Sequence, residues 1–258
     1  MRKALTNFCI FVLFFLVWEL FLAASNFKYT LIPTPTRVIL ALGEIITDNT
    51  LWENTFISFY RLAIGFILGC SFAIPLGLFI GFYKKINYFI KPLLFFIISL
   101  SPLAWLPLLI LWLGFGDLPI IITIFITTFS PLLLLTIECF DKVNDNYFKF
   151  ALNLKLSKIT FFTRIILPII TKQIFKNIKI VFLLSWFILL GSEMINFSSG
   201  LGYYILLSKN YLRADTALSL IFYIGILLIF LNSSILILFK QIHKISVLKM
   251  GFNYVYKN

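Results

Sequence analysis

The sequence is poor in charge, in cysteine and in histidine. Only 12% of its 258 residues are charged, with 3 cysteines and 1 histidine, and this charged share is about half of that in soluble domains. So few charged side chains could not cover a soluble domain that is 61% apolar, with a mean hydropathy of +1.01. The composition excludes a soluble enzyme, a disordered chain and a disulfide-stabilised secreted domain. It indicates an integral membrane protein.

The few reactive side chains form no catalytic or metal-binding pattern. Cys9, Cys70 and Cys139 are scattered along the chain, and the single histidine, His243, lies in a basic C-terminal segment. The Gly-x-x-x-x-Gly-Lys-Ser/Thr sequence that binds ATP phosphates does not occur. We therefore predict that this chain carries no catalytic residue, no metal site and no cofactor.

Long uncharged stretches predict six transmembrane helices. A helix needs roughly 20 apolar residues to cross about 30 Å of hydrocarbon. Four stretches meet this length without any charge, and two more contain one acid each, Glu19 and Glu193. The predicted spans are about 8–27, 60–82, 90–113, 118–138, 179–197 and 216–239. We predict an all-α integral membrane fold with a single transmembrane domain, 1–258, and a first helix that is not cleaved as a signal peptide.

Basic residues are distributed unevenly between the two sides of the predicted membrane. With the N-terminus in the cytoplasm, 17 of the 22 Lys and Arg residues fall in inner segments. The outer segments carry Lys28, Arg37, Arg61, Lys209 and Arg213. This is the positive-inside rule, which predicts that both termini are cytoplasmic. It also accounts for the net charge of +12 without a nucleic-acid partner.

A proline pair follows the first predicted span. After Pro33 and Pro35 the apolar residues Val38, Leu42 and Ile45 recur at helical spacing. This pattern predicts a short amphipathic helix, which lies in the membrane interface or packs on the outer end of the bundle.

The third predicted span contains Pro92, Pro102 and Pro107. Interior prolines break a helix, and a membrane tolerates the freed backbone groups only against protein or a wet cavity. The break therefore lines a transport pathway or serves plain helix packing. The pathway or gate candidates are Ser99, Ser101 and Pro102 at this break, Ser130 in the fourth span and Glu193 in the fifth.

Glu193 is an acid within an apolar helix. Such a residue costs about 2.5–3.5 kcal/mol in lipid on insertion scales, so it should face the bundle interior or a wet cavity. Arg61, at the outer start of the second span, is a possible partner. Two roles stay open, a structural hydrogen bond between helices and a direct role in transport.

The largest inner segment, Glu138–Lys179, carries eight basic residues. Phe148, Ala151 and Leu152 give part of it an apolar face, and Ile165-Ile166-Leu167-Pro168 breaks that pattern. A helix with an apolar stripe outside the bilayer needs a partner surface, and long loops of this kind tend to be functional.

This segment resembles the cytoplasmic loop of bacterial ABC importer permeases. That loop reads Glu-Ala-Ala, three residues, Gly, nine residues, Ile, one residue, Leu-Pro. Here Ala151, Ile165, Leu167 and Pro168 match this pattern. The departures from it are Lys149, Phe150 and Lys155.

Motifs in the rest of the chain are similar to the nitrate, sulfonate, taurine and bicarbonate branch of these permeases. They are Leu31-Ile32-Pro33-Thr34-Pro35, Ser58-x-x-Arg61, Trp112-Leu113-Gly114 after a proline-rich span, and Glu193-Met194 followed by Gly200-Leu201-Gly202. They run in order from about residue 18 to residue 240.

The resemblance implies a multi-pass permease of the bacterial inner membrane, without an ATPase site of its own, surrounded by lipid. A separate cytoplasmic subunit would bind ATP, an external binding protein would deliver the solute, and two permease copies would frame one pathway. The loop at about 140–176 would supply a coupling helix between the fourth and fifth spans, with Lys149, Phe150, Ala151, Lys155, Leu167 and Pro168 at the ATPase. The substrate stays open among nitrate, sulfonate, taurine, bicarbonate and a vitamin precursor.

The alternative is an ion-coupled secondary transporter or a membrane-embedded enzyme. An enzyme needs paired acids, a metal cluster or an activated nucleophile. An ion-coupled carrier usually shows more ionisable residues within the membrane and an internal repeat.

Overall fold

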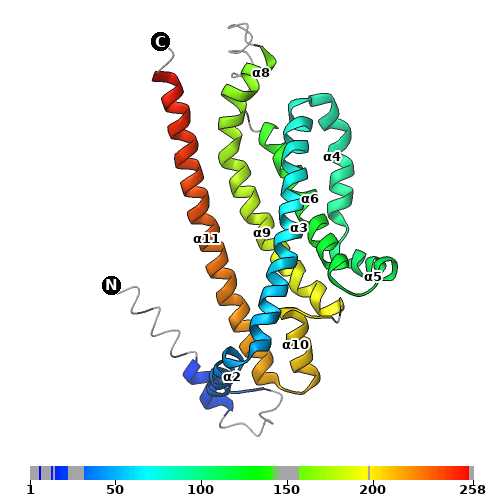
Figure 1. The fold of residues 1–258 in the computed structure, drawn as a ribbon, viewed down its shortest axis with the longest axis vertical. Coiled ribbons are helices and arrows are strands. Elements are labelled where there is room, and N and C mark those ends of the chain that lie inside the picture. Colours follow the sequence, from blue (N-terminus) through cyan, green and yellow to red (C-terminus); the bar gives the residue numbers. More distant parts are fainter. Residues whose placement is uncertain are drawn as a thin grey trace. The chain divides into compact units, whose positions relative to one another are not determined.

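The computed structural model describes residues 6, 13, 15–22, 32–141, 143, 157–196 and 198–255. All regular elements within these ranges are helices (Figure 1), which confirms the all-helical fold. They are α2 (Pro35–Thr47), α3 (Asn49–Phe82), α4 (Lys84–Ser99), α5 (Pro102–Leu113), α6 (Asp117–Asp141), α8 (Lys158–Phe161), the π-helical turn η1 (Phe162–Ile166), α9 (Leu167–Asn196), α10 (Leu201–Asn210) and α11 (Ala214–Val255).

The chain divides into two compact units. Unit 1 comprises residues 1–59 and 193–227, and unit 2 comprises residues 60–192 and 228–258. Helices α3, α9 and α11 each contribute residues to both units.

Four described helices are long and apolar enough to cross a membrane. They are Asn49–Phe82, Asp117–Asp141, Arg164–Asn196 and Ala214–Ser234, and the bent pair Lys85–Ser99 and Pro102–Leu113 makes a fifth if it counts as one span. The predicted first span, 8–27, lies mostly outside the described residues, so the count of six stays a prediction. Helices α3 and α9 are longer than the predicted spans, because each also includes polar residues before its apolar stretch, among them Asn54 in α3 and Lys172 in α9.

In unit 1, the amphipathic segment forms α2, as the spacing predicted. Pro35 occupies its first turn, where a missing N–H costs nothing. Its buried face consists of Val38, Ala41 and Ile45, whereas Ile46 is exposed. The Ser219 hydroxyl of α11 donates to the Val38 carbonyl at 2.7 Å, which holds α2 against the first turns of α11.

In unit 2, α3 packs against α6 through a glycine at nearly every fourth residue. A Cβ on Gly65 would lie 2.8 Å from Ile124, one on Gly69 2.5 Å from Thr128, and one on Gly77 2.7 Å from Thr136. A Cβ on Gly81 would overlap the Phe140 ring. Small residues at this spacing allow close backbone approach, which provides much of the packing energy between helices in lipid.

Polar contacts hold α9 on the same helix of unit 2. The Thr128 and Ser185 hydroxyls lie 2.9 Å apart, and the Asn177 side-chain amide donates to the Leu135 carbonyl at 3.1 Å. All three polar side chains are buried. Helix α6 is therefore the centre of unit 2, since α4 and α5 pack on it as well.

Candidate functional site

Glu193 lies in the last turn of α9 with a side chain that is 0% exposed. The Ser58 hydroxyl of α3 donates to its Oε1 at 2.7 Å. The Gly202 amide, in the first turn of α10, donates to its Oε2 at 2.9 Å. The carboxylate thus connects three helices within unit 1, which meets the expectation of a protein-facing acid.

The same cluster supplies the N-terminal cap of α10. The Leu201 amide donates to Ser58 Oγ at 2.9 Å, and the Gly200 amide donates to Asn54 Oδ1 at 2.7 Å. The first amides of a helix have no partner within the helix, and an anion near them is stabilised by the helix dipole. Asn54 and Ser58 of α3, more than 140 residues away in sequence, and Glu193 at the end of the preceding helix α9 satisfy these amides.

Gly200 is required in this cluster for two reasons. Its φ of 105° is one that L side chains rarely adopt, and a Cβ on it would overlap the Glu193 carboxylate. The Glu193-Met194 and Gly200-Leu201-Gly202 motifs are therefore parts of one structure: an acid, the glycine that makes room for it and the amide that binds it.

Arg61, named from the sequence as a possible partner of Glu193, forms an ion pair with Asp117 in unit 2. Its Nε and Nη2 lie 2.7 Å and 2.6 Å from Asp117 Oδ1. The Arg61 side chain is 1% exposed and that of Asp117 is 51% exposed. A pairing of Arg61 with Glu193 stays a prediction. Asp117 was missed by sequence reasoning, although an acid at the start of an apolar helix, after a glycine turn, is the signal that could have identified it.

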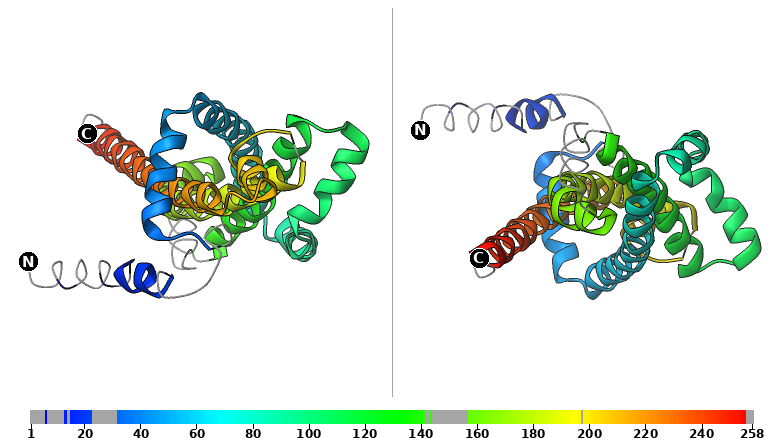
Figure 2. Two further views of the ribbon diagram at one scale, coloured as in Figure 1. Left: turned by 90° about the horizontal axis from the view of Figure 1, so that it is seen from below. Right: turned by 90° about the horizontal axis from the view of Figure 1, so that it is seen from above.

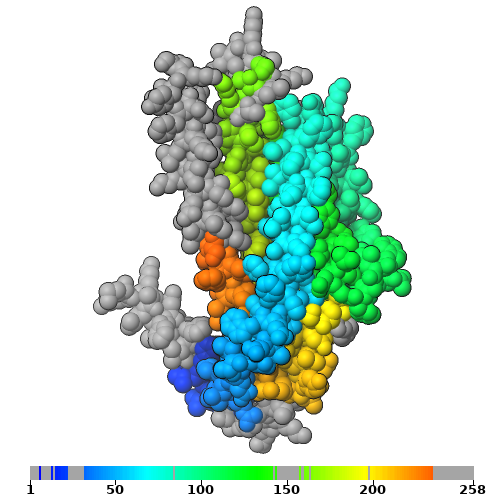
Figure 3. Space-filling model, in the orientation of Figure 1, coloured from blue at the N-terminus to red at the C-terminus, as the bar shows by residue number. Residues whose placement is uncertain are grey.

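The predicted break of the third span is confirmed. Helix α4 ends at Ser99 and α5 begins at Pro102, with an angle of 79° between them. In Figure 2, α4 is seen nearly end-on while α5 runs across the view. Residues of α4 and α5 in unit 2 lie on the surface of the face drawn in Figure 3. The exposed side chains of these helices include Phe89, Leu111 and Trp112.

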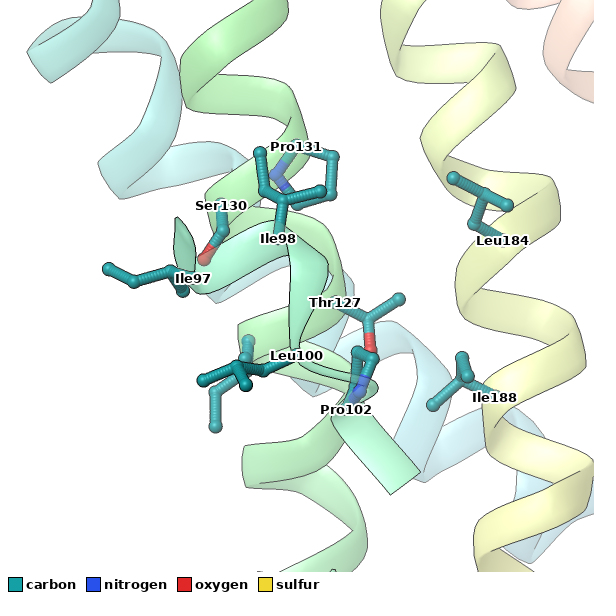
Figure 4. A pocket seen from close by; sticks show the side chains of 10 residues that line it. Ile97, Ile98, Leu100, Pro102, Thr127, Ser130, Pro131, Leu184 and Ile188 are labelled. Carbon is teal, nitrogen blue, oxygen red and sulfur yellow. The ribbon is translucent and has the colours of Figure 1, made fainter. Parts of the chain in front are cut away.

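A pocket of about 180 Å³ lies at this break in unit 2. Two of the pathway candidates, Pro102 and Ser130, line it together with Thr127 (Figure 4). Ser99 and Ser101 do not line it. Ser99 donates its hydroxyl proton to the Phe95 carbonyl at 2.7 Å, and Ser101 is the residue before α5, whose side chain makes no capping hydrogen bond.

Of the candidate coupling residues, Lys149, Phe150, Ala151 and Lys155 lie outside the described residues. Leu167 and Pro168 form the first turn of α9. The chain enters this turn through η1, in which the Leu167 amide bonds back to the Phe162 carbonyl. A π-helical turn accommodates a proline without ending the helix, so the segment at Pro168, where the sequence interrupts the apolar pattern, is a local widening of a continuous helical segment.

This turn packs on the end of α6. Ile166 and Ile170 are 0% and 2% exposed and belong to one apolar cluster with Cys139 and Phe140. The Phe140 and Phe162 rings stack with centroids 6.4 Å apart. The described end of the coupling segment is therefore joined firmly to α6 and α9.

The described residues contain no group of three or more His, Cys, Asp or Glu side chains that could hold a metal ion.

Comparison with known proteins identifies the family. The family described as "binding-protein-dependent transport system inner membrane component" matches residues 73–244. The aliphatic sulfonates transport permease protein of Bacillus subtilis is 28% identical, over 77% of this chain and 72% of that protein. The nitrate import permease protein of Leptolyngbya laminosa is 25% identical over 90% and 85%. The bicarbonate transport system permease protein of Synechococcus elongatus is 29% identical over 82% and 80%.

Proteins of this family are multi-pass inner-membrane subunits that work with a solute-binding protein, while a partner ATPase hydrolyses ATP. The family match covers most of the chain, and the three relatives are named for sulfonates, nitrate and bicarbonate, the branch that the sequence motifs indicated. The chain belongs to the binding-protein-dependent transport family and is a permease component of an ABC importer of small solutes.

Proposed function

We propose that the chain is one of two identical permease copies that together form the pathway, with six spans, both termini in the cytoplasm and the segment 140–176 against the ATPase. One domain, 1–258, would make up each copy, and lipid would cover the exposed apolar side chains of α3 and α4, among them Phe72 and Phe89. The family supports the ATPase and binding-protein partners.

The exposed face of α9 supports this orientation of the chain in the membrane. Lys172 and Lys176 are exposed near its start, and further along the same face Ile180, Leu184 and Phe187 are exposed. Cations at the interface followed by apolar residues indicate where a helix enters the hydrocarbon, and an excess of cations indicates the cytoplasmic side. The start of α9, and with it the coupling segment, is therefore cytoplasmic in this proposal.

The coupling mechanism follows from the packing at the start of α9. Lys149, Phe150, Ala151 and Lys155 would dock on the ATPase, with Leu167 and Pro168 behind them. The apolar cluster around Ile166 and Phe140 supports transmission of an ATPase movement to both α6 and α9. Because packed helices shift between discrete arrangements, such a movement would switch the pathway between inward-open and outward-open states.

The pathway and gate candidates have different roles in this proposal; they are Glu193, Ser99, Ser101, Pro102 and Ser130. Pro102 and Ser130 line the pathway at the α4–α5 break, and Ser99 and Ser101 permit the break. Glu193 holds the start of α10 in place, as its contacts with Ser58 and Gly202 support. In this proposal Glu193 influences the opening of the pathway by holding α10, and it does not contact the solute.

The solute in this proposal is a small anion, since three relatives are named for sulfonates, nitrate and bicarbonate. The test is uptake into proteoliposomes that contain the full chain with its ATPase and binding protein. ATP on the side of the membrane that carries the ATPase should drive uptake of a labelled small anion that the binding protein recognises. Uptake driven by a proton or sodium gradient without ATP would contradict the proposal.

A further inference from the structure

The last residue of α6, Asp141, is bound by two side chains of α4. The Lys91 Nζ atom lies 2.8 Å from Asp141 Oδ2, and the Asn87 side-chain amide donates to Asp141 Oδ1 at 3.4 Å. Asn87 and Lys91 are four residues apart, so they lie on the same face of α4, about one turn from each other. Both oxygens of one carboxylate are thus bound from a single helix face, which resists sliding of α4 along α6. We call these three residues the Asp141 clamp.

The clamp supplies a charge that the end of α6 lacks. An acid at the C-terminus of a helix faces the negative end of the helix dipole, where a cation is favoured. The last turn of α6 contains Asp141 and no basic residue. Lys91 brings the favourable charge from a different helix, so this end of α6 is stabilised while α4 lies beside it.

Apolar packing continues from the clamp toward the break of the span. Apolar side chains recur at every fourth residue of α4 and belong to one cluster with α6 residues such as Leu134; they are Ile86, Ile90, Leu94 and Ile98. Helix α4 then ends at Ser99, and α5 begins at Pro102 with a bend of 79°. Since close-packed interiors transmit strain, a displacement at the end of α6 reaches this break through α4.

The clamp is also a polar connection between α4 and the coupling segment at about 140–176. Asp141 lies at the start of this segment, and the apolar cluster of Ile166 and Phe140 contains no described α4 residue. Among the side chains that the structure describes, α4 makes hydrogen bonds or ion pairs with another helix through Asn87 and Lys91. Lys91 is 31% exposed and Asp141 is 47% exposed, so their ion pair adds little to stability. The pair therefore serves to position α4 more than to stabilise the fold.

We propose that the Asp141 clamp makes the bent span follow the coupling segment, so that the α4–α5 break opens and closes with the ATPase cycle. Asn87 and Lys91 are positioning residues in this mechanism, because they act through Asp141 and touch neither the solute nor ATP. The inference rests on the proposed docking of the segment 140–176 on the ATPase. It adds the path by which a movement of that segment reaches α4 and α5.

The test follows the reactivity of a thiol at the break. Leu100→Cys, in a full chain whose Cys9, Cys70 and Cys139 are replaced by Ala, places one thiol between α4 and α5, where Leu100 lines the pocket. The chain is assembled with its ATPase in lipid nanodiscs, which leave both sides accessible. It is then treated with 2-(trimethylammonium)ethyl methanethiosulfonate, with and without ATP and vanadate. ATP and vanadate should change the reaction rate by about fivefold or more, the lower end of ordinary coupling between two sites.

Breaking the clamp should remove this response. Lys91→Met and Asp141→Asn should each reduce the effect of ATP and vanadate to less than about twofold, while ATPase co-purification and the thermal midpoint stay unchanged. The swap Lys91→Glu with Asp141→Lys should restore the response. Asn87 fits either arrangement, because its side-chain oxygen has no hydrogen-bond partner among the described residues and can accept from the swapped ammonium group. The control is Lys85→Met, at an exposed lysine of α4 outside the clamp, and it should leave the response unchanged.

Three results would overturn the inference. If Lys91→Met and Asp141→Asn respond to ATP and vanadate as fully as the chain with its clamp, the clamp does not carry the movement. If both single variants lose the response and the swap does not restore it, the attraction between the two charges is not what positions α4. If Leu100→Cys reacts equally with and without ATP while the clamp is present, the break does not move with the ATPase. None of these results bears on ATP-driven uptake, which tests the proposed function separately.

Discussion

The Ser58 hydroxyl connects a helix terminus to a buried acid. Its Oγ accepts the Leu201 amide proton at 2.9 Å and donates its own proton to Glu193 Oε1 at 2.7 Å. An amide can only donate, so Ser58 accepts this proton and keeps its own hydroxyl proton for the Glu193 carboxylate. Both Glu193 oxygens are then acceptors, one for Ser58 and one for Gly202.

The substitution Glu193→Gln should therefore destabilise the chain. Glutamine has one acceptor oxygen, and its NH₂ group would face either the Ser58 hydroxyl or the Gly202 amide, leaving a buried donor without an acceptor. We expect a loss of about 1–3 kcal/mol, measured as a lower thermal midpoint of tryptophan fluorescence in detergent. The control Glu44→Gln removes an exposed acid paired with exposed Arg213 and should change stability by less than about 1 kcal/mol.

Uptake by Glu193→Gln separates a structural role from a transport role. Wild-type stability with lost uptake would show that the negative charge of Glu193 is needed for transport itself and not for folding. Normal uptake over a range of pH would exclude a required charge at this position.

Gly200→Ala should damage the same cluster sterically. Its Cβ would overlap the Glu193 carboxylate and would also require a strained φ of 105°. Gly114→Ala is the matched control, because its φ is 79° but nothing lies within 4 Å of the added atom. Both variants should lose about 1–3 kcal/mol from backbone strain. Gly200→Ala should lose more stability than Gly114→Ala, measured as the thermal midpoint of unfolding. Equal midpoints for the two variants would mean that the Glu193 cluster adjusts to the added atom without cost.

Asp117→Asn should weaken the attachment of α3 to the start of α6. It removes the carboxylate that faces the buried guanidinium of Arg61. Breaking a surface ion pair costs about 0–1 kcal/mol of stability, and breaking a fully buried one costs about 3–5 kcal/mol. Because Asp117 is half exposed, we expect a loss of stability between these two ranges. Asp141→Asn, which removes the partner of the better exposed Lys91, should cost less. A larger loss for Asp141→Asn would contradict the importance assigned to Arg61.

The proposed topology predicts that Asn146 is cytoplasmic. In a chain without its three natural cysteines, Asn146→Cys should resist an impermeant maleimide in intact cells and react after permeabilisation. Labelling from outside intact cells would overturn the orientation.

The sequence was sufficient for those parts of the fold that depend on composition and spacing. Uncharged length predicted the helices, and the prolines of the third span predicted a break in it. The break falls at Pro102, whereas Pro92 and Pro107 lie inside α4 and α5 without ending them. The η1 turn at Pro168 was not predicted, since whether a proline ends a helix or widens it depends on the packing of Ile166 and Phe140.

Contacts between distant segments could not be predicted in the same way. Glu193 was identified as a costly buried acid, but its partners Ser58 and Gly202 are 135 and 9 residues away, and no spacing rule connects them. The glycines of α3 that pack on α6 were likewise missed. Their four-residue spacing from Gly65 to Gly81 is visible in the sequence, and a search for small residues at helical spacing would have found them.

Coupling to the ATPase is tested most directly with Ala151→Glu in the reconstituted importer. A carboxylate placed in an apolar docking surface would cost several kcal/mol unless paired. We predict that Ala151→Glu inserts normally but loses ATP-driven uptake and co-purification of the ATPase, while Asn153→Glu, the same change at a nearby polar residue, retains both. Wild-type uptake with normal ATPase co-purification in Ala151→Glu would contradict the coupling role of this segment.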